Sequence, residues 1–126
     1  MIPLVKPILG KREKQLINEV IDSGIIASGK YVEEFEKKFT KLSKAKYGVV
    51  CSSGTTALHT ALLACGIKPG DKVITTPFTF IATANSILYC GAKPIFADID
   101  YKTFDIDPKS VEKILKKELN NICSFD

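Results

Sequence analysis

The sequence predicts an α/β fold, and its pattern and composition both support this prediction. After two amphipathic helices, short apolar runs alternate with helical segments in the order β-α-β-α-β-α. Strands and helices that alternate at this spacing are typical of a parallel sheet with flanking helices. The 126 residues suffice for one domain, and 45% hydrophobic with 25% charged residues is the composition of a globular one.

Charge and cysteine content argue against several classes of protein. The 18 basic and 14 acidic residues give a net charge of +4, and the basic residues are scattered, so a nucleic-acid binder is not expected. No apolar run approaches the roughly 18 residues that span a bilayer, and the proline-containing start is unlike a secretory signal. The four cysteines are far apart and the chain has one His, which argues against a zinc site. We expect a cytoplasmic protein with reduced thiols.

Residues 1–46 are predicted to form two amino-terminal helices. The first covers Lys11–Asp22, with apolar residues at helical spacing, and Gly24 stands where a left-handed cap ends a helix. The second follows the loop at residues 25–30 and places acidic residues before basic ones, as the helix dipole favours. Its apolar face comprises Val32, Phe35, Phe39 and Leu42.

Residues 47–126 are predicted to contain three strands and three helices. Tyr47–Cys51 is almost entirely apolar, which is typical of a strand buried on both faces. Asp107 and Pro108 are typical of a helix start, with an N-cap and a proline in the first turn. The other expected elements are strands over Lys72–Thr75 and Pro94–Ala97, helices over Ala57–Cys65 and Ile81–Cys90, a turn at Lys68–Asp71, and a last helix to Leu119.

The segment Ser52–Thr56 is a candidate phosphate-binding loop. It lies between a predicted buried strand and a helix, so backbone N–H groups would point out of the helix amino terminus. Gly54 allows close approach of a ligand, and hydroxyl groups surround it. The alternative is that these Ser and Thr residues only cap the helix. The segment matches neither the Walker nor the G-x-G-x-x-G pattern.

A second candidate segment, Thr76–Phe80, follows the second predicted strand. Ligands of open parallel sheets bind beyond the carboxyl ends of the strands, and Phe78 and Phe80 could offer a flat face there. The alternative is that both rings pack into the core. His59 is expected to be a structural residue, and the aspartates at 98–107 are expected to form turns and caps rather than a calcium site.

Four linked motifs resemble one known family. They are Ser52-Ser-Gly-Thr-Thr-Ala-Leu-His59, Pro69-Gly-Asp-Lys-Val-Ile-Thr75, Pro77–Asn85 and Gly91–Asp100. In this order they strongly resemble the amino-terminal part of the DegT/DnrJ/StrS family, pyridoxal-phosphate-dependent aminotransferases that act on nucleotide-linked keto sugars. The resemblance extends to about Leu119, and Ser28–Glu36 is also similar to the family.

The resemblance implies a fold, a cofactor and site residues. The fold would be the amino-terminal part of the large domain of a fold-type I transferase, with a mostly parallel and incomplete sheet. Gly54, Thr55 and Thr56 would bind the phosphate of pyridoxal 5'-phosphate, and Phe80 would stack on its ring. In the full-length family, glutamate donates the amino group, a homodimer forms, and the products serve polysaccharide, glycan or antibiotic-sugar biosynthesis.

The chain also departs from the family pattern. The Schiff-base lysine and the carboxylate that pairs with the pyridinium nitrogen lie further downstream in the family, and nothing here matches either, so we expect this chain alone to be inactive. Later strands separate the family's first strand from its second, so Tyr47–Cys51 would lack a neighbour and the isolated chain would fold poorly or pair its strands differently. The alternatives are a non-catalytic remnant, which associates at most with a full-length paralogue, or a small stand-alone phosphate-binding domain.

Overall fold

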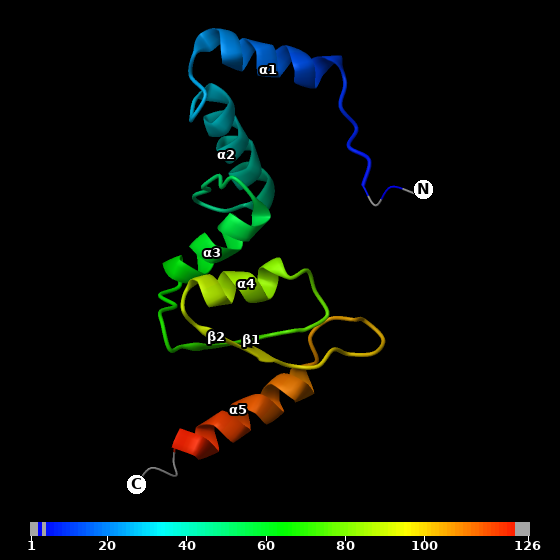
Figure 1. Cartoon of the computed structure of the whole chain (residues 1–126), viewed down its shortest axis with the longest axis vertical. Helices are drawn as coiled ribbons and strands as arrows, with labels where there is room; N and C mark the ends of the chain where they lie inside the picture. Colours follow the sequence, from blue (N-terminus) through cyan, green and yellow to red (C-terminus); the bar gives the residue numbers. More distant parts are fainter. Residues whose placement is uncertain (1–2, 4, 123–126) are drawn as a thin grey trace. The chain divides into compact units, whose positions relative to one another are not determined.

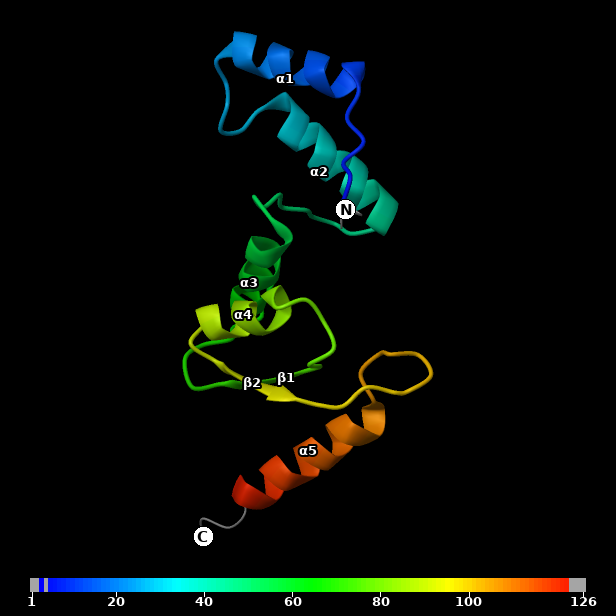
Figure 2. The same ribbon diagram turned by 45° about the vertical axis from the view of Figure 1, so that its right-hand side comes forward.

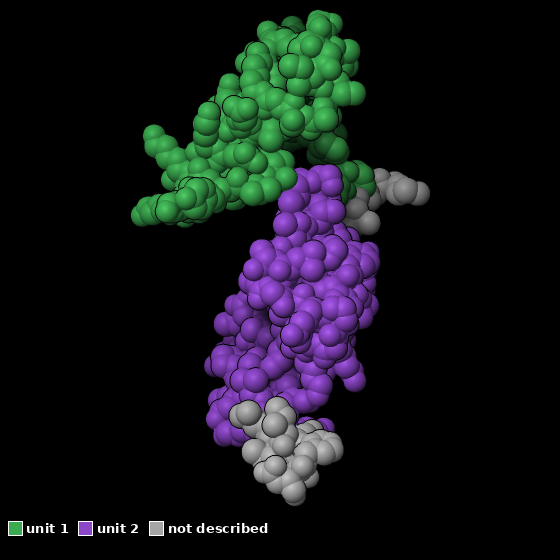
Figure 3. Space-filling model, turned by 90° about the vertical axis from the view of Figure 1, so that its left-hand side faces the viewer, with its two compact units in different colours: residues 1–50 green, residues 51–126 purple. Residues whose placement is uncertain are grey.

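The structure is a computed structural model that describes residue 3 and residues 5–122. It divides into two compact units, residues 1–50 and residues 51–126, which Figure 3 shows in different colours. No helix in the described part of the chain combines the length and the apolar character needed to cross a bilayer.

The first unit contains two helices, α1 (Lys11–Ser23) and α2 (Lys30–Ser43). Gly24 ends α1 with a φ of +69°, and its N–H donates to the Ile21 carbonyl, as predicted for a left-handed cap. The Tyr31 hydroxyl, in the first turn of α2, donates to the Glu19 carboxylate on α1. No residue of α1 or α2 is fully buried, so this unit has no closed core of its own.

The second unit follows the predicted alternation from its first helix onward. Its elements are α3 (Gly54–Ala64), β1 (Lys72–Thr75), α4 (Ala82–Tyr89), β2 (Lys93–Phe96) and α5 (Pro108–Ile122). The strands β1 and β2 pair in parallel, with Lys72 opposite Lys93 and Thr75 opposite Phe96. The helix α4 connects β1 to β2 in sequence, and Figures 1 and 2 show it lying over the sheet and running opposite to the strands. The predicted α/β class with a parallel sheet is confirmed.

A small core lies between α4 and the two-stranded sheet. Ile87, Cys90 and Ala92 are nearly inaccessible to solvent, with exposed fractions of 3–4%. Three partly buried apolar side chains pack against them: Leu62, Ile67 and Val73. Gly91 completes the turn into β2 at a φ of +71°, where a Cβ would lie 2.9 Å from Pro69 Cγ.

The strand predicted at Tyr47–Cys51 is absent, and that prediction was wrong. The sheet of the described residues contains β1 and β2 alone. Tyr47 and Val49 are 77% and 80% exposed. An apolar run becomes a strand only where another strand accepts its backbone hydrogen bonds, and the sheet of the described residues does not include this segment.

Candidate functional site

The amino terminus of α3 is closed by a reciprocal cap between two hydroxyl residues. Ser53 is the N-cap, and its Oγ accepts the Thr56 N–H at 3.2 Å. In return, Thr56 Oγ1 accepts the Ser53 N–H at 3.0 Å and donates to the Ser53 carbonyl at 2.8 Å. The pattern is that of a capping box with Thr in the place of Glu. The cap holds the first turn of α3 in one geometry.

Two amides of this turn remain for a ligand. The N–H groups at the start of a helix have no intrahelical acceptor, and in the described part of the chain no acceptor is recorded for Gly54 or Thr55. Gly54 is exposed, and a Cβ built on it would meet no atom within 4 Å. An anion could therefore approach both amides without displacing protein atoms, and the positive end of the helix dipole would favour it.

The capping interpretation of Ser52–Thr56 holds for two of its residues. Ser53 and Thr56 cap the helix, whereas Gly54 and Thr55 present free backbone donors. The Thr56 amide and hydroxyl are already engaged in the cap. The role of Gly54, Thr55 and Thr56 as phosphate ligands stays a prediction.

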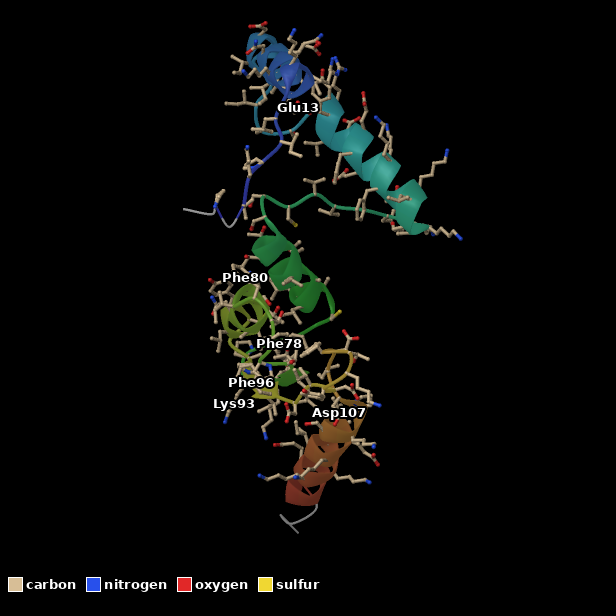
Figure 4. The ribbon with its side chains drawn as sticks, turned by 90° about the vertical axis from the view of Figure 1, so that its right-hand side faces the viewer. Glu13, Phe78, Phe80, Lys93, Phe96 and Asp107 are labelled. Carbon is tan, nitrogen blue, oxygen red and sulfur yellow. The ribbon has the colours of Figure 1, made fainter. Side chains whose placement is uncertain are left out.

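Phe78 and Phe80 do not pack into the core. They are 62% and 76% exposed, and Figure 4 shows both in the second unit. The Phe78 ring lies against Phe104, with centroids 5.7 Å apart, whereas Phe80 has no recorded aromatic neighbour among the described residues. Phe80 precedes Ile81, the N-cap of α4, and its carbonyl accepts the Thr83 N–H. Its open ring face is therefore available for the stacking role predicted for it.

The two candidate segments lie at one edge of the fold. Phe80 follows the carboxyl end of β1 and precedes α4, and α4 packs on α3. In Figure 1 both helices begin on the side where β1 ends. The amino termini of both helices and the carboxyl end of β1 thus face the same side of this unit, the side where parallel sheets bind ligands.

Charged side chains are absent from the sequence of both candidate segments and of α3. Backbone amides, hydroxyl groups and the helix dipole are therefore the attractive groups for an anion at this place. Each such hydrogen bond to a charged group contributes about 1.5–3 kcal/mol before binding entropy is subtracted. Binding of a phosphate ester by this chain should consequently be weak.

The other residues considered in the sequence, His59 and the aspartates at 98–107, have contacts within the fold: His59 contacts an aromatic ring, and two of the aspartates accept backbone hydrogen bonds. His59 is half-buried, with its ring edge-on to Tyr89 at a centroid distance of 5.7 Å. Asp100 accepts the N–H groups of Lys102 and Thr103, and these hydrogen bonds lower the pKa of its carboxyl. Asp107 accepts the Lys109 N–H at the start of α5. The expectation that the aspartates form turns and caps is confirmed for these two.

Capping was the open alternative for Ser53, and the Ser-x-x-Thr spacing before an apolar helix is the signal that favours it. One feature of this edge was not predicted. A second hydroxyl pair, Thr79 Oγ1 and Thr83 Oγ1, lies 3.1 Å apart across the start of α4. Its four-residue spacing matches one helical turn, which the sequence alone could have indicated.

Comparison of the sequence with known proteins finds one matching family and similar relatives. The DegT/DnrJ/EryC1/StrS aminotransferase family matches residues 7–124. The spore coat polysaccharide biosynthesis protein SpsC of Bacillus subtilis is 48% identical over 111 residues, which are 88% of this chain and 28% of SpsC. GDP-perosamine synthase of Vibrio cholerae is 40% identical over 125 residues, which are 98% of this chain and 34% of the synthase.

Solved structures show the same likeness in three dimensions. An aminotransferase from Psychrobacter cryohalolentis superposes with a TM-score of 0.79 at 35% identity, covering 88% of this chain and 29% of that one. NtdA of B. subtilis with bound cofactor PMP gives 0.77 at 39% identity, covering 84% and 25%. This chain thus spans about a third or less of the length of the relatives it matches. The resemblance inferred from the motifs is confirmed, and the chain belongs to the DegT/DnrJ/EryC1/StrS aminotransferase family.

Proposed function

We propose that this chain supplies the phosphate-binding and ring-stacking part of a pyridoxal-phosphate-dependent aminotransferase. The observation that carries the proposal is the pair of open amides at Gly54 and Thr55, held by the cap behind them. NtdA, a family member that is similar over 84% of this chain, has PMP bound in its solved structure.

The residues present fit the phosphate end and the ring of this cofactor. The N–H groups of Gly54 and Thr55 would donate to phosphate oxygens, and the Thr55 hydroxyl would add a third donor. Open space at Gly54 leaves room for the phosphate. Phe80 would support one face of the ring and so fix its plane. When bound, the cofactor supplies the electron sink of transamination.

The proposed reaction of the whole enzyme is transfer of an amino group from glutamate to a nucleotide-linked keto sugar. GDP-perosamine synthase and SpsC, by their names, belong to nucleotide-sugar and polysaccharide biosynthesis. A cytoplasmic homodimer is the form that we propose for the full-length enzyme. No lysine of this chain matches the family's cofactor lysine, so we propose that the chain alone does not catalyse the reaction.

Binding of pyridoxamine 5'-phosphate tests the proposal directly. This compound has no aldehyde, so surface lysines cannot capture it. We expect saturable binding by calorimetry or fluorescence, with inorganic phosphate competing. Thr55→Val should weaken binding about fivefold or more, because it removes one hydrogen bond to a charged group.

The matched control is Thr60→Val, five residues further along α3, where the side-chain hydrogen bond recorded among the described residues is a long one from the Cys51 sulfur at 3.8 Å. This variant should bind as the unchanged chain does. Equal weakening in both variants, or binding that phosphate does not compete, would contradict the assignment of the phosphate site.

A further inference from the structure

His59 is the single histidine of the chain, and the proposed function does not use it. It belongs to a half-buried stripe on α3 that also contains Thr55 and Leu62. Spacings of four and three residues place these side chains on one face of the helix. That face packs on α4, because Leu62 contacts the core beside α4 and the His59 ring lies edge-on to Tyr89.

His59 stands one helical turn from the proposed phosphate site. Residues four apart on a helix are neighbours, with Cβ atoms about 5–6 Å apart, and helical side chains lean toward the amino end. Both tendencies bring the imidazole toward Thr55, whose N–H is one of the two amides for which no acceptor is recorded among the described residues. We therefore expect the ring within about 10 Å of an anion held there, which is the screening length of 0.1 M salt.

The helices that pack together here carry no other charge. Residues 51–67 and 73–92 contain no Asp, Glu, Lys or Arg. Histidine is the side chain whose ordinary charge change falls between pH 5 and 8. The remaining titratable groups of the two ranges are a phenol and three thiols: Tyr89, Cys51, Cys65 and Cys90. Phenols and thiols are ordinarily neutral below about pH 7.5, so the net charge beside the site depends on His59.

We infer that the charge on His59 controls how tightly the amino terminus of α3 holds an anion, with tighter binding of a phosphate group in weak acid than near pH 8. The inference rests on the proposed function, because the anion is the phosphate end of the cofactor. A protonated imidazole adds a positive charge to a site that otherwise attracts an anion through amides, hydroxyl groups and the helix dipole. A neutral imidazole adds none.

Sulfate is the probe that tests this inference. It keeps its double charge from pH 5.5 to 7.5, whereas a phosphate ester changes its own charge in that range. Amide NMR of the full chain at constant ionic strength follows the signals of Gly54 and Thr55. We expect shifts at both amides that saturate with sulfate, with an affinity at pH 5.5 at least about threefold higher than at pH 7.5.

The reciprocal effect gives a second measurement on the unchanged chain. If protonation of His59 strengthens sulfate binding, sulfate must favour protonation of His59 by the same factor. The ring C–H signals of the single histidine should therefore titrate with a midpoint about half a pH unit higher in saturating sulfate than in sodium chloride of equal ionic strength. This measurement needs no substitution and so does not depend on the folding of a variant.

His59→Gln is the test variant, because glutamine is polar but cannot become charged. It should bind sulfate with one affinity from pH 5.5 to 7.5, within about twofold of the affinity of the unchanged chain at pH 7.5. Lys68→Gln is the matched control. It removes a charge from an exposed position in the loop after α3, and it should retain the threefold change with pH.

Three results would overturn the inference alone: equal sulfate affinity at the two pH values, a His59 midpoint that sulfate does not move, or a pH dependence that persists in His59→Gln. In each of them the amides still bind the anion, so the proposed phosphate site stands. Absence of sulfate shifts at Gly54 and Thr55 at every pH would overturn the phosphate site and the inference together. Failure of the proposed function is thereby distinguished from failure of the role of His59.

Discussion

Ser53 and Thr56 bond to each other in both directions at the amino terminus of α3. The Thr56 N–H donates to Ser53 Oγ at 3.2 Å, and the Ser53 N–H donates to Thr56 Oγ1 at 3.0 Å. The arrangement occupies the third amide of the helix and leaves those of Gly54 and Thr55 for a ligand. In the proposed site, one pair of residues holds the turn and the other meets the phosphate.

Removing the Thr56 hydroxyl should therefore weaken ligand binding indirectly. Thr56→Val deletes the bonds of the hydroxyl to the Ser53 N–H and carbonyl, keeps the Thr56 N–H bond to Ser53 Oγ, and should destabilise the start of α3 by about 1 kcal/mol. Affinity for pyridoxamine phosphate should fall with it, by about fivefold. Thr56→Ser keeps the hydroxyl and should restore both properties, as measured by calorimetry and amide exchange. If Thr56→Ser binds no better than Thr56→Val, the cap is not what positions the amides.

Gly91 should be the glycine of the second unit that is least tolerant of substitution. Gly91→Ala places a Cβ 2.9 Å from Pro69 Cγ at a φ of +71°. Backbone strain and overpacking together should cost about 2–4 kcal/mol. Gly66→Ala is the control, because Gly66 has a similar φ of +83° but open space around it, and should cost only about 1–2 kcal/mol. Urea unfolding of the two variants measures the difference, and equal losses would refute the packing argument.

The Tyr31–Glu19 pair should make the first unit sensitive to pH at both extremes. The hydrogen bond to Glu19 raises the pKa of Tyr31 above its ordinary 10.0, and the same bond lowers the pKa of Glu19 below its ordinary 4.5. The stabilisation is complete between these two ordinary values. It is lost as pH falls through the pKa of Glu19, and also as pH rises through that of Tyr31.

Titration of the phenols by ultraviolet absorbance checks this behaviour. The chain has four tyrosines. Tyr31→Phe should remove the component that ionises at the highest pH and should also raise the pKa of Glu19 toward its ordinary value. Tyr101→Phe is the control, since Tyr101 is 88% exposed, and should leave the high-pH component in place. Loss of that component in the Tyr101 variant instead would show that the bond to Glu19 does not form in solution.

Phe80 should contribute more to cofactor binding than Phe78. Phe80→Ala removes the proposed stacking face and should weaken pyridoxamine phosphate binding by about 1 kcal/mol, or fivefold. Phe78→Ala removes a ring that already contacts Phe104, and should change binding by less than twofold. Fluorescence titration of the ligand compares the two variants. A larger effect at Phe78 would contradict this prediction and would indicate that the cofactor ring binds near Phe104 instead.

Much of the fold was predictable because its signals are local. Gly24 marks the end of α1 by the conformation that it alone adopts readily, and Asp107 with Pro108 marks the start of α5. Helical and strand periodicity located β1 and α4 to within one residue. The helices among these elements need only their own sequence and a nearby apolar surface to form, and β1 has β2 beside it.

The absence of a strand at Tyr47–Cys51 could not be predicted from the residues of that segment, because a strand exists only with a partner. Local composition gives β-propensity, whereas pairing depends on strands that stand elsewhere in sequence. At the candidate site, composition indicated glycine and hydroxyl residues at a helix start but not which of them cap the helix. Which hydroxyl caps and which amide stays open depends on side-chain rotamers that the sequence does not specify.

An amide NMR titration of the full chain with pyridoxamine 5'-phosphate tests the central claim most directly. We predict shifts that saturate at the Gly54 and Thr55 amides and at Phe80, are reversed at the two amides by inorganic phosphate, and leave Gly24 unmoved. Shifts absent from Gly54 and Thr55, or confined to residues 1–50, would contradict a phosphate site at the start of α3.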